Sequence, residues 1–443
     1  MFHDKIKSFF SSAVDKTVSS ISEYAVNPGR DFSRSRKLPP DRLITFLVSE
    51  GAGTTKNELL DFFGLDPEKP TSSALNQQRA KLKPEAVEAV FKEFNSSIDS
   101  LDLLEAYRFL AVDGSTVTYP SGPSFSPSEY FSSPGSSSKG CYSMHINAFY
   151  DLDRHIYTDA LIQPVRLKDE FRAFCSPADR HPVLPGTRNV YIGGRGYCSY
   201  NNMAHVIENG QYFVFRAKDI LSKGMLCNFK FPEKDSFDVS VNVVLVRSHS
   251  RKIRIKPGCY RRFVDKAASF DFIEYSSYDT YELSFRVVRF SISDNSFECI
   301  VTNLPKEEFP PGRLKKLYFL RWGIESSFRK LKYTIGLNSF HSCKPQYIRQ
   351  EIWARLITYN ITEVLACHAA IRHQKETKYT YKVNFSTAAH ICRCFLRPAA
   401  EKTSVPIMSL LEQELIPVRD ERQYPRLKTA HFRKPRYFIY RAS

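Results

Sequence analysis

The sequence lacks the cysteine spacings that mark a zinc site or a disulfide framework. Its ten cysteines are scattered singly, no CxxC occurs, and Cys392 and Cys394 are the only close pair. Structural zinc sites and disulfide-stapled domains normally show paired cysteines at short spacing. We therefore expect neither feature, and we expect a reducing, cytoplasmic environment.

Long hydrophobic runs are also lacking. No stretch approaches the ~18 uninterrupted apolar residues that a membrane-spanning helix needs. The first residues, Met1 to Ala13, mix lysines with phenylalanines and contain no continuous apolar segment. We therefore expect no membrane span and no signal peptide.

Acidic residues are few relative to basic ones. The chain has 443 residues, with 64 Lys and Arg against 47 Asp and Glu, a net charge of +17 and an isoelectric point near 9.3. A basic protein attracts polyanions because binding releases their condensed counterions. Nucleic acid is the favoured partner, and a basic soluble protein without one is the alternative. The length predicts two or three domains.

A helical pattern near the N-terminus predicts a small helix-turn-helix-like module. It falls into four short pieces, at 41–49, 55–63, 72–82 and 84–94. The third piece presents Gln77, Gln78 and Arg79, whose side chains can bond adenine and guanine edges if the helix enters a groove. The alternative is an ordinary solvated helix face.

Apolar and alternating runs further along the chain predict a sheet. The expected strands are 108–117, 145–151, 154–162, 189–194 and 212–219, with a helix before the last of them. The first strand contains Asp113, which is followed directly by Gly114. Between Phe237 and Leu304 the pattern is β-rich without a helix, which predicts an inserted β subdomain. Helical patterns return after Pro310 and over 345–368.

Four polar residues share one face of the helix predicted over 314–332. Tyr318, Arg321, Glu325 and Lys332 project within about 60° of one another at ~100° per residue. The neighbouring apolar stripe should face the core and consists of Leu317, Leu320, Ile324, Phe328 and Leu331. A carboxylate flanked by cations and a phenol suits an acid held against a phosphate. The alternative is a surface salt-bridge network.

The spacing Tyr-x2-Arg-x3-Glu-x6-Lys resembles the signature of the insertion-sequence-four-like DDE transposases. Three further segments are similar to that family: VDGS at 112–115, HINAFYDLDRHIYTDA at 145–160 and IGGRGYCSYN at 192–201. The resemblance covers roughly 38–368. It implies an α+β or α/β fold in which helices flank an RNase H-like mixed sheet, with an inserted β-rich subdomain and an N-terminal helical DNA-binding domain.

The resemblance also assigns roles to individual residues. Asp113 would be the first catalytic acid and Glu325 the third, and both would hold Mg²⁺ or Mn²⁺ in a two-metal site. Gly194 stands where the family has its second aspartate. The residues that would bind DNA phosphates are Tyr318, Arg321, Lys332 and Arg195. Asp219, at the end of the next strand, is not expected to replace the missing acid.

The implied organisation has six segments. They are an N-terminal extension (1–37), the helical domain (38–104), the first part of the catalytic domain (105–235), the inserted β subdomain (236–308), the second part of the catalytic domain (309–400) and a basic tail (401–443). The tail is either a phosphate-binding arm or a solvated end.

Three functions follow as hypotheses. The first is a transposase that binds the inverted terminal repeats of an insertion sequence, pairs two ends as a dimer and cleaves and joins them to target DNA. Such a protein would be bacterial and associated with the nucleoid. The second is a catalytically impaired, DNA-binding relative, because Gly194 carries no carboxylate. The third is a basic structural or RNA-binding protein with a coincidental motif.

Overall fold

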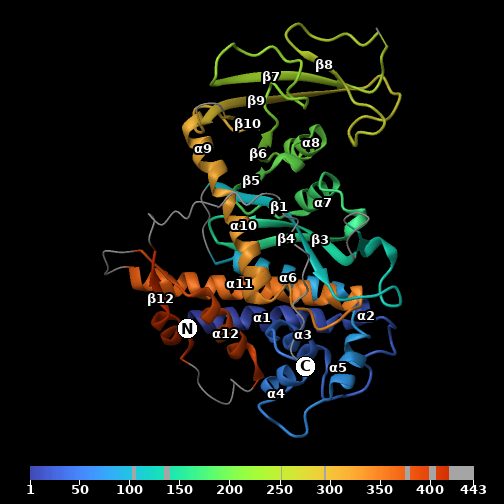
Figure 1. Cartoon of the computed structure of the whole chain (residues 1–443), viewed down its shortest axis with the longest axis vertical. Helices are drawn as coiled ribbons and strands as arrows, with labels where there is room; N and C mark the ends of the chain where they lie inside the picture. The colour runs from blue at the N-terminus through green and yellow to red at the C-terminus, as the bar shows by residue number, and fades with distance from the viewer. Residues whose placement is uncertain are drawn as a thin grey trace.

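The computed structural model describes residues 1–101, 106–133, 140–250, 252–293, 296–374, 380–398 and 406–418. A helical body, a central sheet and a β-rich lobe follow one another along the longest axis of the molecule (Figure 1). The basic segment from 419 to 443, part of the expected tail, lies outside the described residues.

The N-terminal region is helical, as the pattern predicted. Its helices are α1 (Phe2–Ser19), α2 (Ile21–Tyr24), α3 (Pro40–Ser49), α4 (Thr55–Phe62), α5 (Ser72–Arg79) and α6 (Pro84–Asp99). Helix α1 was not predicted, although Ile6, Phe10 and Val14 recur at four-residue spacing and are buried. This stripe makes α1 part of the hydrophobic core that also contains the buried faces of α3 and α6.

Five strands form the middle of the sheet in the order β4-β3-β1-β5-β6. They are β1 (Tyr107–Tyr119), β3 (Cys141–Asp151), β4 (Ile156–Pro164), β5 (Arg188–Gly193) and β6 (Tyr212–Ala217), and short β2 (Phe131–Ser132) pairs with β3. β3 is antiparallel to β1 and β4, whereas β5 is parallel to β1 and β6. All five strands expected from the pattern are present.

The β-rich stretch expected as an insertion continues this sheet. Its strands are β7 (Phe237–Val246), β8 (Tyr260–Phe263), β9 (Thr280–Ser293) and β10 (Ser296–Thr302). β10 pairs with β6, and β9, β7 and β8 follow outward. Backbone hydrogen bonds therefore join the β-rich lobe directly to the central strands, and the two regions share one core cluster.

Helices cover both faces of the central sheet (Figure 1). One side carries α7 (Arg172–Arg180) and α8 (Tyr200–Glu208), and the other carries α6 and α11 (Pro345–Gln374). The short 3₁₀ helices are η1 (Ser128–Tyr130), η2 (Val165–Leu167) and η3 (Arg195–Tyr197). Near the C-terminus lie α12 (Phe385–Leu396), α13 (Ile407–Gln413) and the pair β11 (Tyr381–Val383) and β12 (Leu415–Pro417).

The helix predicted over 314–332 is interrupted. It divides into α9 (Pro311–Leu320), α10 (Trp322–Arg329) and the π-helical turn η4 (Lys330–Ile335). At the break, two backbone N–H groups donate to the carbonyl three residues earlier, as in a 3₁₀ helix: Arg321 N to Tyr318 O and Ile324 N to Arg321 O. The expectation that Leu320 faces the core is wrong, because the changed helical phase leaves this side chain 52% exposed.

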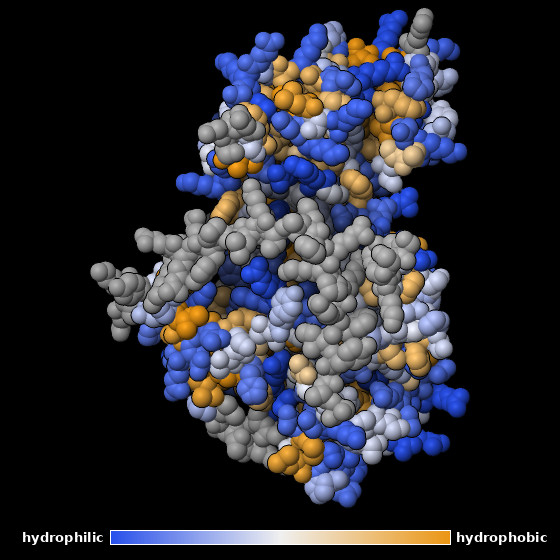
Figure 2. All heavy atoms as spheres, viewed as in Figure 1, coloured by the Kyte–Doolittle hydropathy of each residue, from blue (hydrophilic) through white to orange (hydrophobic). Residues whose placement is uncertain are grey.

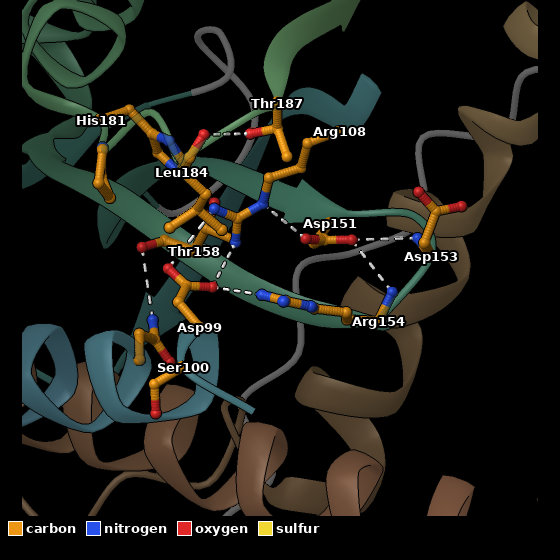
Figure 3. A network of polar contacts seen from close by, with 12 residues as sticks. Asp99, Ser100, Arg108, Asp151, Asp153, Arg154, Thr158, His181, Leu184 and Thr187 are labelled. Atoms are coloured by element: carbon orange, nitrogen blue, oxygen red, sulfur yellow. Dashed lines mark hydrogen bonds and ion pairs between the residues drawn. The ribbon is translucent and has the colours of Figure 1, made fainter. Parts of the chain in front are cut away.

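A buried charge network ties α6 to the central sheet (Figure 3). Arg108 on β1 bonds Asp151 at 2.8 Å and Asp99 at 2.9 Å, and Arg154 also pairs with Asp99. Because Arg108 is 1% exposed, removal of one partner would leave a desolvated charge unpaired. The network therefore fixes the helical body against the strand that carries Asp113.

None of the described helices combines the length and apolar character that crossing a bilayer requires. All ten cysteines are free thiols. On the face shown in Figure 2, hydrophilic side chains are spread over both lobes, and apolar side chains occur in small groups among them.

Candidate active site

Asp113 and Glu325 are brought together although 212 positions separate them in the sequence. Arg321 lies between them: its guanidinium is 2.8 Å from Glu325 Oε1 and 3.4 Å from Asp113 Oδ2. Asp113 belongs to β1, whereas Arg321 and Glu325 lie at the start of α10. The helix therefore places the third predicted acid over the strand that carries the first.

The Asp113 carboxyl lies in an environment that disfavours its charge. Burial raises its pKa, and repulsion from Glu325 and Glu170 adds to this effect. Arg321 and the Gly114 backbone N–H, which donates to Asp113 Oδ1 at 3.0 Å, oppose the rise. The side chains of Asp113 and Glu325 are 28% and 35% exposed. Both carboxylates are therefore reachable from solvent, and a cation between them would be stabilised.

The other residues of the four-residue motif also face this site. Arg321 lies over the ring of Tyr318, with 5.6 Å between the guanidinium carbon and the ring centroid. Lys332 Nζ donates to Thr116 O on β1 at 2.9 Å. Burial lowers the pKa of Lys332, so its ammonium is poorly solvated and suited to an anionic ligand.

Gly194 follows the last residue of β5 and leaves open space beside Asp113. The parallel register aligns Val112 with Gly193, so the next residues on the two strands are Asp113 and Gly194. A Cβ built at Gly194 meets no heavy atom within 4 Å. The backbone angles there, φ −74° and ψ −172°, are open to any L-residue. An aspartate would therefore fit at Gly194 without strain.

Comparisons with known proteins bear on this arrangement. A family model described as a transposase DDE domain matches residues 105–361. The chain belongs to the DDE transposase family. The match spans β1 with Asp113 through the helices that carry Glu325 and Lys332. The motif is therefore not a coincidence in a basic structural or RNA-binding protein.

A curated relative and a solved structure are similar to this DDE transposase-family chain. The transposase InsG for insertion sequence element IS4 of Escherichia coli (strain K12) is 28% identical over 128 residues, which are 27% of this chain and 28% of the relative. The predicted resemblance to the insertion-sequence-four-like DDE transposases agrees with this relative and with the match to the transposase DDE domain. The piggyBac transposase in a synaptic complex with hairpin DNA has a TM-score of 0.44 and 10% identity, over 91% of this chain and 81% of its own.

The sequence analysis of this transposase-family chain also named Arg195 as a phosphate-binding residue and Asp219 as an acid not expected to replace the missing one. Arg195 is exposed and directly follows Gly194 at the start of η3. Asp219 instead bonds Arg289 at 3.0 Å, and this pairing helps to keep the pKa of Asp219 low against the opposing effect of burial. Asp219 is therefore engaged elsewhere and is not brought to the carboxylate pair.

Two of the three α5 residues that were expected to read bases are buried in this structure. Arg79 is 1% exposed, bonds Glu351 at 3.0 Å and also donates to Gln350, both on α11. Gln78 is 8% exposed, whereas Gln77 is exposed. The last turn of α5 docks against α11 through these bonds, a tertiary contact that local periodicity does not reveal.

Replacing Arg79 by Met should therefore destabilise the protein by about 3–5 kcal/mol, because the buried Glu351 would lose its guanidinium partner and keep only the imidazole of His341, at 3.3 Å, as a charge partner. The decrease would be measured as a lower denaturant midpoint. The matched change Gln77→Ala, on the exposed face of the same helix, should stay within about 0.5 kcal/mol of the unaltered protein. If Arg79→Met kept full stability but lost selectivity for a DNA end, a base-reading role for Arg79 would be supported instead.

The sequence reasoning missed a polar group on the α7 and α8 side of the sheet. His145 and Asn147 alternate on β3, and Tyr197 donates to Asn147 Oδ1 at 3.0 Å. Glu170, in the turn before α7, lies near them, with its Oε1 3.7 Å from His145 Nε2. The alternation of His145 and Asn147 was a usable signal, since Gly114 pairs with Asn147 in the register. Nothing local distinguishes Glu170 from an ordinary loop acid.

Proposed function

We propose that this chain is a transposase that binds the terminal repeats of an insertion sequence and cleaves and joins DNA strands with divalent metal ions. The observation that carries the proposal is the convergence of Asp113 and Glu325 on Arg321. The strand order β4-β3-β1-β5-β6, in which β3 runs opposite to the other four strands, supports an RNase H-like catalytic domain. The partners would be terminal-repeat and target duplexes, bound by a dimer in the bacterial nucleoid.

The donor set fits a hard divalent cation. Asp113 and Glu325 offer carboxylate oxygens, which Mg²⁺ and Mn²⁺ prefer, and both side chains reach solvent. They are the residues of the proposed site that would hold the metal. When bound, a pair of such ions would activate the attacking oxygen and stabilise the leaving oxygen. Gly194 contributes no side-chain ligand.

The cationic side chains would orient the DNA in this mechanism. Lys332, which donates to Thr116 O on the strand of Asp113, and the exposed Arg195, next to Gly194, would bind phosphates on either side of the scissile bond. Water attacks the phosphorus, the P–O bond to the 3′ oxygen breaks, and a 3′ hydroxyl is released. That hydroxyl then attacks a target phosphodiester, forms the new bond and displaces a second 3′ oxygen. Arg321, beside both acids, would stabilise the negative charge that develops on phosphate.

The second candidate function is DNA binding without efficient cleavage. The open space at Gly194 favours it, because no side-chain oxygen stands beside Asp113 on the neighbouring strand. The test is a duplex taken from the DNA that flanks this gene, incubated with the full chain and Mn²⁺. Strand nicking supports the transposase, whereas specific binding without nicking supports the second function.

A further inference from the structure

We propose that Cys175, His205 and Asp271 form a zinc site that connects the β-rich lobe to two helices of the central sheet. The three residues lie on α7, on α8 and in the segment between β8 and β9. Their donor atoms, a thiol sulfur, an imidazole nitrogen and a carboxylate oxygen, all lie within 4.8 Å of one another. The inference does not rest on the proposed function, because the site shares no residue with the Asp113 and Glu325 pair.

The three donors are of the kinds that Zn²⁺ binds. Zn²⁺ takes thiolate, imidazole and carboxylate ligands in tetrahedral geometry, whereas Mg²⁺ and Mn²⁺ favour oxygen alone. With Zn–S and Zn–N distances near 2.3 and 2.0 Å, a tetrahedral ion separates its donors by about 3.4–3.6 Å. The donors of this cluster would therefore close by little more than about 1 Å on binding. Water would supply the fourth ligand.

Two carboxylates hold the His205 ring in the orientation of a metal ligand. Nδ1 of the ring is 3.0 Å from Asp179 Oδ1, and Nε2 is 2.9 Å from Asp271 Oδ2. Histidines that ligate a metal through one ring nitrogen commonly contact a carboxylate through the other, which fixes the ring. Neither Asp179 nor Asp271 forms an ion pair with a lysine or arginine among the described residues. A divalent cation would therefore neutralise an excess of negative charge.

Two buried asparagines position the other two ligands. Asn201 Nδ2 donates to Asp271 Oδ2 at 2.8 Å, and Asn201 Oδ1 accepts from the Asp271 backbone N–H at 2.9 Å. The same Nδ2 is 3.6 Å from Cys175 Sγ, so this amide spans the carboxylate and the thiol. The thiol donates to Asn202 Oδ1 at 3.3 Å, and Zn²⁺ binding would release this proton to solvent.

The segment that carries Asp271 is packed against the two helices on either side of the ligand. Phe270 and Ile273 are buried in the core cluster that also contains Phe174 of α7 and Met203 of α8. Residues 264–279 form neither a helix nor a strand, so a bound zinc ion would add a strong tie to an otherwise irregular segment. The paired-cysteine spacing could not indicate this site, because its ligands include a single cysteine.

Co²⁺ and Zn²⁺ binding to the full chain tests the proposal without DNA. Metal-free protein titrated with Co²⁺ should develop the charge-transfer absorption of a cobalt thiolate, and added Zn²⁺ should abolish it. Cys175→Ser should remove this absorption and weaken Zn²⁺ binding by more than about 100-fold, since even an outer-shell loss costs roughly 10- to 100-fold. Asp271→Asn should also weaken Zn²⁺ binding. Cys259→Ser, which removes another thiol of the β-rich lobe, should bind both metals like the unaltered chain.

The unfolding temperature provides a second measurement. It should rise with Zn²⁺ concentration in the unaltered chain and in Glu274→Gln, which removes an exposed acid of the same segment. The rise should be lost in Cys175→Ser and in Asp271→Asn.

Two results would overturn the proposal. One is the absence of thiolate absorption in the unaltered chain, which would leave the cluster as hydrogen bonds and ion pairs only. The other is absorption that persists in Cys175→Ser, which would place the metal on another thiol. Because Cys175 is buried, unfolding without metal shows whether its serine variant is folded. If that variant does not fold, Asp271→Asn decides, since unchanged Zn²⁺ affinity at this exposed ligand would refute the site.

Discussion

Asp113→Asn and Glu325→Gln should each reduce DNA cleavage by more than about 100-fold while leaving DNA binding nearly unchanged. Loss of an outer-shell group at a metal site costs roughly 10- to 100-fold, and a direct ligand should cost more. Both carboxylates converge on Arg321, so neither can replace the other. Strand nicking of an end-containing duplex with Mn²⁺ is the measurement.

Asp235→Asn provides the matched control for the Asp113 variant. Asp235 is 85% exposed, lies two residues before β7 and is 4.0 Å from Arg289 on β9. Its replacement should leave both binding and nicking intact. Nicking by the Asp113→Asn chain at the rate of the unaltered protein would show that the reaction uses a different site.

DNA affinity should fall by about 10³- to 10⁵-fold between roughly 50 and 200 mM salt, if the interface neutralises about 6–10 phosphates. The physical reason is counterion release by a chain of net charge +17. A plot of log affinity against log salt should be linear, and fluorescence anisotropy of a labelled duplex would give its slope. Arg195→Ala should reduce that slope by about one, because one phosphate contact is lost.

Lys256→Ala is the control for this slope. Lys256 is 72% exposed and pairs with Glu282 in the β-rich lobe, so its removal should leave the salt dependence unchanged. A salt response that is flat for the unaltered chain would contradict an interface dominated by phosphate contacts.

Much of the fold and the principal site could be predicted from the sequence because they depend on strong local patterns. The apolar run before Asp113 and the alternation of the following strands identified the central sheet. The fixed spacing from Tyr318 to Lys332 identified the helix that crosses it, and the structure brings Glu325 to Asp113. Predicting these features requires only the periodicity of the sequence and the residue types.

What could not be predicted depends on contacts between distant segments. Arg79 looked like a solvated helix residue, yet its guanidinium is buried against α11. Leu320 followed the helical stripe, but the break at Arg321 turned it toward solvent. Glu170 is an ordinary loop acid until the fold places it against Gly196. In each case tertiary packing determined the outcome, and no local pattern records that packing.

The docking of α5 on α11 limits how this protein can be rearranged by recombination or engineering. Helix α11 has 30 residues and belongs to the C-terminal half of the chain, yet it supplies both Gln350 and Glu351 to Arg79 of the N-terminal helices. The N-terminal helices therefore cannot be exchanged independently of α11. A chimera that took these helices from a relative would inherit a mismatched buried charge, unless the facing turn of α11 were exchanged with them.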